Sequence, residues 1–105
     1  MVGVKELHEG NFDAFIKEGK VVIDFWAPWC GPCKILSPAV EEVAKELKGV
    51  KFGKINVDEN PELAQRFQVM SIPTLIYWKN KEMVNRTVGA MPKDELEDVI
   101  KESFN

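Results

Sequence analysis

Residues 21–33 read VVIDFWAPWCGPC, an apolar strand that runs directly into a pair of closely spaced cysteines. Cys30 and Cys33 are the only cysteines of the chain, and two residues separate them. Such a pair can close into a small disulfide ring or open to a dithiol. The apolar residues that follow have helical spacing, so the sequence predicts a strand-to-helix junction at the pair. Because unpaired N–H groups at the start of a helix favour a thiolate, this junction indicates a redox site.

A structural role explains the pair poorly. In the chain-entropy model, a disulfide that closes a four-residue loop contributes about 2 kcal/mol, whereas a long loop gives about 5 kcal/mol. A zinc site is another alternative, but tetrahedral zinc needs four ligands and His8 is the only histidine of the chain. We therefore expect a redox-active pair and no metal site.

The composition is that of a soluble globular protein. Hydrophobic residues make up 45% of the 105 residues, which is enough for an ordinary core, and we expect a single domain over residues 1–105. The net charge is −3 and no basic run occurs, so we expect no nucleic-acid partner. No segment approaches transmembrane length, and the stretch 1–6 lacks the apolar run of a secretory signal. We therefore expect a cytoplasmic protein without a membrane partner.

Strands and helices alternate in the first half of the chain, and a hairpin and a helix follow. Residues 21–27 carry apolar side chains on both faces, as expected for a central strand that is covered on both sides. Pro38 lies inside the helical pattern that follows and should kink that helix, because proline lacks a backbone donor. A tight turn at Asn80 and Lys81 joins two further strands, and Lys81 stands where such turns prefer glycine. The predicted strands are 21–27, 51–57, 74–79 and 83–88, and the predicted helices are 12–16, 33–47, 61–67 and 92–103.

The starts of three helices carry recognisable signals. Asn11 and Asn60 are predicted N-caps, and Pro61 suits the first helical position because its missing N–H is not needed there. Pro92 is expected to open the last helix. These elements predict an α/β layered domain, in which helices cover both faces of a mixed sheet.

Four patches of the chain match one known pattern, and together the resemblance runs from end to end. The patches are VIDFWAPWCGPCK at 22–34, KINVD at 54–58, SIPT at 71–74 and VGA at 88–90. The chain resembles the thioredoxin family. The resemblance implies a thioredoxin fold, with a central mixed five-stranded sheet that has a four-stranded core and carries four helices on its two faces. It also implies thiol–disulfide exchange as the reaction.

The chain departs from the family pattern at few positions. Met70, Lys81 and Met83 stand where more polar residues or glycine are expected, and Pro92 replaces a usual polar cap. None of these residues belongs to the redox pair. Met70 is the departure that we expect to bear on the choice of partner.

Thiol–disulfide exchange gives the two cysteines different roles. Cys30 precedes the helix and is the predicted nucleophile, which forms a mixed disulfide with the substrate. Cys33 lies three residues on and is expected to resolve that intermediate. Gly31 and Pro32 are expected to tune the redox potential, because proline limits the conformations of the loop and glycine lets a substrate chain come close. The Gly-Pro pair resembles that of the reducing members of the family.

Asp24 is an acid in the middle of an apolar strand. Burial without a partner raises the pKa of a carboxyl group, so Asp24 should be partly protonated at neutral pH. The resemblance places Asp24 beneath Cys33 and implies that it exchanges a proton with that thiol. The alternative is a polar core residue that local hydrogen bonds satisfy. The resemblance also places the Lys54 ammonium near Asp24 as a secondary tuning group, although a solvated strand-edge lysine fits the pattern nearly as well.

The surface around Cys30 is predicted from the resemblance. Pro73 looks like the cis-proline of the family, which turns the Ile72 backbone outward to pair with an extended substrate segment. The alternative is a trans-proline that begins a strand, since only about 5–6% of such bonds are cis. Apolar residues around the nucleophile suit the docking of varied protein partners. These residues are Trp29, Ile72, Gly89 and Ala90, with Met91 as a further candidate.

The residues and the resemblance together predict a protein-disulfide reductase. We expect it to reduce disulfides in protein substrates and to be recharged by a separate reductase of the thioredoxin-reductase type. The pair Cys30–Cys33 stores both electrons, so no bound cofactor is expected, and the chain has no Gly-rich dinucleotide motif. The alternatives are an isomerase or oxidant of the same fold, and a binding module that holds a partner without turnover. A monomer is the default, because the redox site claims the apolar surface that the sequence places.

Overall fold

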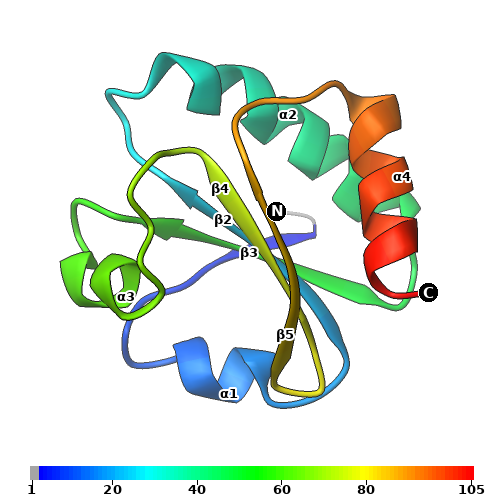
Figure 1. Cartoon of the computed structure of the whole chain (residues 1–105), viewed down its shortest axis with the longest axis horizontal. Helices are drawn as coiled ribbons and strands as arrows, with labels where there is room; N and C mark the ends of the chain where they lie inside the picture. The colour runs from blue at the N-terminus through cyan, green and yellow to red at the C-terminus, as the bar shows by residue number, and fades with distance from the viewer. Residues whose placement is uncertain (1–2) are drawn as a thin grey trace.

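The computed structural model describes residues 3–105, which build a five-stranded sheet with helices around it (Figure 1). Met1 and Val2, the first residues of the stretch assessed for a secretory signal, lie outside the described residues. The strands are β1 (Val4–Glu6), β2 (Lys20–Trp26), β3 (Val50–Asn56), β4 (Thr74–Lys79) and β5 (Glu82–Val88). The helices are α1 (Phe12–Ile16), α2 (Gly31–Glu46), α3 (Pro61–Arg66) and α4 (Lys93–Ser103).

The order of the strands across the sheet is β1-β3-β2-β4-β5. β3 pairs in parallel with β1 and β2, whereas β4 pairs antiparallel with β2 and β5. The sheet is therefore mixed. This arrangement confirms the predicted α/β class with a mixed five-stranded sheet.

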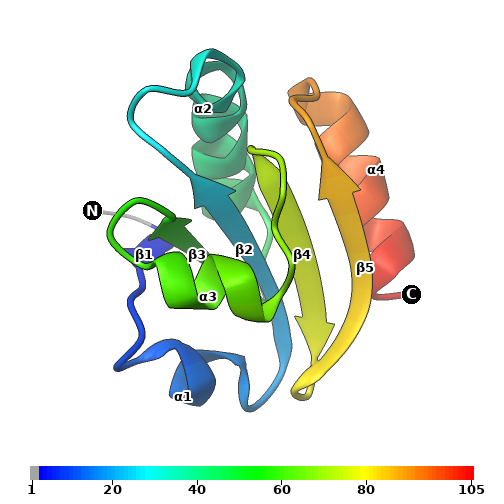
Figure 2. The same ribbon diagram turned by 60° about the vertical axis from the view of Figure 1, so that its left-hand side comes forward.

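Helices cover both faces of the sheet (Figure 2). On one face Val22 of β2 packs in a cluster with Leu36 of α2 and Leu96 of α4. On the other face Ile23 of β2 packs in a second cluster with Phe12 of α1, and α3 contributes to the same layer. Two separate core layers follow from the alternation of side chains along each strand. No helix in the part of the chain that the structure describes is both long and apolar enough to cross a lipid bilayer.

β2 lies in the middle of the sheet and leads the chain to the redox pair. All residues from Val21 to Phe25 are buried, which confirms the prediction of a strand covered on both faces. β2 ends at Trp26 and α2 begins at Gly31, so the loop between them is short. Cys30 therefore lies at a strand-to-helix junction, as the sequence predicts.

Several predicted bounds differ from those of the structure. The helix predicted from Cys33 begins two residues earlier, at Gly31, because the proline between the cysteines fits the first turn. α4 begins at Lys93, and Pro92 occupies the N-cap position with an extended backbone. The residue pattern does not locate β1, because a strand of three residues is too short to show a period.

Both predicted asparagine caps stand at the N-cap position, but neither side chain caps its helix. The Asn11 Oδ1 atom accepts a hydrogen bond from the His8 N–H at 2.8 Å. The Asn60 Nδ2 atom donates to the carbonyl oxygen of Asn56 at 3.1 Å. Local contacts with the preceding loop thus replace the expected caps, because short polar side chains bond readily to nearby backbone.

The turn between β4 and β5 has the tight backbone that the sequence predicts. Asn80 and Lys81 have φ angles of 51° and 74°, so Lys81 adopts the left-handed region at a steric cost. The Asn80 Oδ1 atom accepts a hydrogen bond from the Gly19 N–H at 2.8 Å, and the Asn80 N–H donates to the Gly19 carbonyl at 2.9 Å. These two bonds tie the turn to the segment that precedes β2.

Gly53 offers a test of packing in β3. A Cβ atom at this position would lie 2.6 Å from Leu7 Cδ1 and 3.2 Å from Phe15 Cε2. Because interiors are close-packed, we expect Gly53→Ala to lower the free energy of unfolding by about 1–3 kcal/mol in urea denaturation. Gly31→Ala is the control, since a Cβ atom there meets nothing within 4 Å. Equal losses in the two variants would contradict the packing argument.

Candidate active site

Cys30 and Cys33 meet at the first turn of α2, where their sulfurs form a disulfide. Their Cα atoms are 5.3 Å apart. Cys30 is the N-cap residue of α2, and its sulfur accepts a hydrogen bond from the Cys33 N–H at 3.2 Å. This position combines free N–H groups with the positive end of the helix dipole. The site can therefore stabilise a thiolate on Cys30 once the disulfide is reduced.

Gly31 and Pro32 form the exposed first positions of α2, directly between the cysteines. Proline fits this turn because a backbone N–H at this position would have no partner inside the helix, so its absence costs nothing. A Cβ atom at Gly31 would meet nothing within 4 Å, so space is open beside this residue. The effect of both residues on the redox potential stays a prediction.

A second loop, which leads into β4, approaches the disulfide. The Ile72–Pro73 peptide bond is cis, the form that the resemblance implies. The carbonyl oxygen of Ile72 lies 3.7 Å from the Cys30 sulfur. The carbonyl of Pro73 accepts a hydrogen bond from the Gly89 N–H at 2.8 Å. Loops before β4 and after β5 are therefore tied together beside Cys30.

Four predicted contact residues lie on these loops, and we call them the docking surface: Trp29, Ile72, Gly89 and Ala90. Trp29 and Ala90 are exposed, whereas Ile72 and Gly89 are half-buried. The further candidate Met91 is not part of this surface. Its side chain is buried and packs in the core cluster between the sheet, α2 and α4, because the chain turns inward there toward α4.

Asp24 is buried in β2, with 3% of its surface exposed. Its Oδ1 atom has no hydrogen-bond partner among residues 3–105, which does not fit the alternative of a core residue satisfied by local hydrogen bonds. Burial raises the pKa of Asp24 to about 7, and the positive charge of Lys54 offsets part of that effect. A carboxyl group in this state can both accept and donate a proton near neutral pH.

Lys54 lies opposite Asp24 in the register of β2 and β3. Its Nζ atom lies over the ring of Trp26, 5.4 Å from the ring centroid. β3 is an inner strand and Lys54 is half-buried, so the alternative of a solvated strand-edge lysine does not fit. Lys54 thus acts on the Asp24 carboxyl by its charge and not by a hydrogen bond.

A small pocket reaches Cys33 from the side of α2. Its volume is about 240 Å³, and Trp26, Pro38 and Glu41 are among the residues that line it. Cys33 is buried, with 2% of its surface exposed, and it lies at the wall of this pocket.

Asp58 is a site residue that the sequence reasoning misses. Its Oδ2 atom accepts a hydrogen bond from the Trp29 Nε1–H at 2.9 Å, although the indole is 69% exposed. The Asp58 N–H donates in turn to the Oδ1 atom of Asn56 at 2.9 Å, which fixes the turn after β3. The exposed indole therefore has a defined orientation. The sequence offers one signal for Asp58, since it ends the KINVD patch. No local pattern pairs it with Trp29, which lies 29 residues away in the chain.

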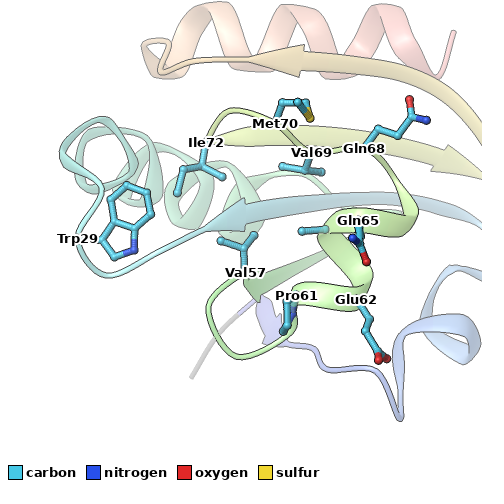
Figure 3. A pocket seen from close by; sticks show the side chains of 10 residues that line it. Trp29, Val57, Pro61, Glu62, Gln65, Gln68, Val69, Met70 and Ile72 are labelled. Atoms are coloured by element: carbon cyan, nitrogen blue, oxygen red, sulfur yellow. The ribbon is translucent and has the colours of Figure 1, made fainter.

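An apolar pocket of about 650 Å³ extends the docking surface toward α3 (Figure 3). Trp29 and Ile72 lie at one end of the pocket, and Gln68 lies at the other. Val57 and Met70 are among the residues between them. The sequence reasoning misses this pocket, because its walls come from the redox loop, the end of β3, α3 and the loop before β4.

Arg86 of β5 holds one side of this pocket in place. Its guanidinium donates hydrogen bonds to the carbonyl oxygens of Phe67 and Gln68, where α3 ends. Gln68 has a φ angle of 53°, so the chain leaves the helix direction there and enters the loop that leads to β4. Arg66 anchors α3 on its other side through an ion pair with Asp13 at 2.9 Å.

Known proteins share both the sequence and the fold of this chain. A family model described as Thioredoxin matches residues 3–102. A thioredoxin of Staphylococcus saprophyticus is 46% identical over 94% of this chain and 96% of that protein. Thioredoxins of Chlamydia pneumoniae and Listeria monocytogenes are 48% and 47% identical over 92% of this chain and 95% of theirs. A chain of a solved structure on the thiol-resolving mechanism of yeast mitochondrial 1-Cys peroxiredoxin superimposes with a TM-score of 0.87, at 34% identity over 94% of both chains.

The fold and the cysteine pair define a thiol–disulfide oxidoreductase, the class of protein that exchanges disulfides with other thiols. Within that class, the chain belongs to the thioredoxin family and has the thioredoxin fold. The family's activity is the reduction of protein disulfides, and in general a reductase restores its dithiol. Within residues 3–105 no group of three or more His, Cys, Asp or Glu side chains is arranged to hold a metal ion.

The raised pKa of Asp24 makes stability depend on pH. The folded group keeps its proton to about pH 7, whereas the unfolded group loses it near the ordinary value of 3.8. Between these values the folded state binds more protons, so the free energy of unfolding falls as pH rises, by about 4 kcal/mol in all. Asp24→Asn removes this pH-dependent fall in the free energy of unfolding, because an amide does not titrate. In urea denaturation of the disulfide form, we expect it to stabilise the protein at pH 8.5 and to leave it nearly unchanged at pH 4.

Asp13→Asn is the matched control, with the opposite sign. The hydrogen bond from Arg66 lowers the pKa of Asp13, so its contribution is present above the ordinary pKa and is lost as pH falls. Asp13→Asn should therefore destabilise the protein slightly at pH 8.5 and not at low pH. A gain in Asp24→Asn that is equal at both pH values would contradict the role of burial.

Proposed function

We propose that this protein reduces disulfides in protein substrates with Cys30 as its nucleophile, Cys33 as its resolving thiol and Asp24 as its proton carrier. The observation that carries the proposal is the position of Cys30, which caps α2 and faces the loop at Ile72 beside an exposed docking surface. The proposed nucleophile and the proposed substrate contact thus come from separate elements that meet beside the disulfide.

The first step is attack by Cys30. In the reduced protein, its thiolate attacks one sulfur of a substrate disulfide and forms a mixed disulfide, and the other substrate sulfur leaves as a thiolate and takes a proton. The N–H groups at the start of α2 support the negative charge on Cys30 before the attack. Cys30 is the sulfur that faces the docking surface, and it therefore meets the substrate first.

The second step is resolution by Cys33. Its thiol gives a proton to the Asp24 carboxylate, and the thiolate attacks the Cys30 sulfur of the mixed disulfide. The second substrate sulfur leaves and is protonated, and the Cys30–Cys33 disulfide forms. Two electrons and two protons pass from the dithiol to the substrate. A pKa of Asp24 near 7 supports this role, since the group gives and accepts protons at neutral pH. The charge of Lys54 keeps that pKa from rising further.

The substrate docks as an extended segment beside Cys30. The outward carbonyl of Ile72 and the cis-Pro73 loop offer backbone for pairing, and Trp29, Gly89 and Ala90 offer apolar contact. The exposed indole of Trp29 is already oriented by Asp58, so less freedom is lost on binding. Gly31 and Pro32 leave the surface over the sulfurs open to the substrate chain.

A separate reductase recharges the pair. The reduced Cys30–Cys33 dithiol stores both electrons, and giving them up closes the disulfide, so the reaction needs no bound cofactor. A dithiol of this kind works as a reductant in a reducing compartment, which supports the cytoplasm as its location. Residues 1–105 form a single domain. The protein acts as a monomer, so its docking surface is free for partners.

Two other functions compete with reduction. An isomerase or oxidant of the same fold would have a redox potential at or above about −180 mV, whereas a general reductant lies near roughly −270 mV. A pure binding module would keep its function when both cysteines are changed to serine. Equilibration with a thiol–disulfide buffer, read by tryptophan fluorescence, decides between the two redox roles.

Single cysteine variants separate the two sulfurs. Cys33→Ser should form a stable mixed disulfide with a disulfide-bonded protein such as insulin, because the resolving thiol is gone. Cys30→Ser should form no complex through Cys33, because Cys33 lies inside the first turn of α2 and its sulfur does not face the Ile72 carbonyl as that of Cys30 does. Non-reducing gels followed by mass spectrometry measure the complexes. Equal trapping by the two variants would refute the assignment of the nucleophile.

Removal of the Asp24 carboxyl should slow the resolution step. For Asp24→Asn at pH 7 we expect the mixed disulfide to resolve more slowly, by on the order of tenfold to hundredfold, because Cys33 loses its proton acceptor. Formation of the mixed disulfide should change little. Rapid mixing and acid quench follow both steps. A resolution rate equal to that of the wild type would refute proton transfer by Asp24.

A further inference from the structure

Met70 is the most exposed of the large apolar side chains among the described residues, with 92% of its surface accessible. It lies in the loop between α3 and β4 and lines the apolar pocket beside the redox pair (Figure 3). An apolar side chain in this position contributes nothing to the core. Its contact with water is relieved only when a partner covers it.

The pocket continues the docking surface, and its lining suits one kind of group. Trp29 and Ile72 belong to both, and the carbonyl of Ile72 is 3.7 Å from the Cys30 sulfur. A substrate held at Cys30 therefore places a side chain next to its cysteine at the mouth of the pocket. The lining is mainly apolar, and Glu62 is its one charged side chain. An apolar side chain that flanks the substrate disulfide fits this environment.

We propose that the thioether of Met70 is an oxidation site at which a peroxide weakens the docking of protein substrates. The inference rests on the proposed function, because it concerns the same substrates. Oxidation makes the flexible apolar side chain polar, and a polar group at the wall of an apolar pocket has to lose water when a partner binds. The chemistry at the two cysteines is not affected.

The oxidation of Met70 by hydrogen peroxide needs no other group of the protein. The Met70 sulfur gives two electrons to hydrogen peroxide and gains one oxygen atom, so a sulfoxide forms and the peroxide leaves as water. The O–O bond breaks and an S–O bond forms. Methionine sulfoxide reductases reverse this modification, which makes it a switch rather than damage alone.

The structure favours Met70 over the other methionines that it describes. Met91 is buried in the core and is shielded from peroxide. Met83 is 42% exposed, but it pairs with Trp78 beside the turn that joins β4 and β5, whereas the docking surface adjoins the opposite ends of these strands. Oxidation of Met83 should therefore leave docking unchanged.

The experiment treats the disulfide form with hydrogen peroxide, so that both cysteines are protected. The peroxide is removed, dithiothreitol restores the dithiol, and mass spectrometry measures sulfoxide at each methionine. The kcat/KM for insulin, with dithiothreitol as electron donor, is compared before and after treatment. Reduction of bis(2-hydroxyethyl) disulfide, which is too small to fill the pocket, is measured in parallel.

We expect kcat/KM for insulin to fall about tenfold in the treated wild type, through a higher KM, which corresponds to about 1.4 kcal/mol. The rate with the small disulfide should stay unchanged. Met70→Leu should not respond to peroxide, because its side chain is apolar and lacks sulfur, whereas Met83→Leu should respond like the wild type. Each variant is compared with its own untreated form.

Three outcomes would overturn the inference: no change in treated wild type with sulfoxide at Met70, an equal loss in Met70→Leu, or an equal loss with the small disulfide. Failure of the proposed function shows separately, as untreated protein that does not reduce insulin at all.

Discussion

The N-cap position of Cys30 is the constraint on which the rest of the site depends. Backbone N–H groups at the start of α2 have no partner inside the helix, and the sulfur of Cys30 takes one of them from Cys33. The same geometry brings the two sulfurs within bonding distance and favours the thiolate that attacks. It exists because β2, buried on both faces, ends where α2 begins and allows the short loop little freedom.

The buried carboxyl group of Asp24 lowers the stability of the folded protein at its centre. A carboxyl group in the middle of a buried strand opposes folding at neutral pH, and an apolar residue of similar size would not. The register of β2 and β3 sets Lys54 opposite it, and the lysine charge offsets part of the cost without removing it. A pKa close to neutral pH is what the proposed proton carrier requires, so the burial that opposes folding is also the burial that would suit Asp24 to that role.

Recognition depends on loops that the fold ties together. The Gly89–Pro73 hydrogen bond joins two of them beside Cys30, and Arg86 holds the end of α3 next to the pocket. These contacts come from β4, β5 and α3, so elements outside the redox loop hold part of the docking surface in place. Met70 extends from this framework into water, which makes it available both to a partner and to a peroxide.

Several features could be predicted from neighbours along the chain or from the period of apolar residues: the redox pair, its strand-to-helix junction, the buried acid at Asp24 and the mixed α/β layers. The sequence pattern does not show β1, which is too short to have a period, and the predicted side-chain caps at Asn11 and Asn60 were wrong. The Trp29–Asp58 bond and the pocket beside α3 were decided by tertiary structure alone. Their partners lie far apart in the chain, and only the packing of strands and helices brings them together.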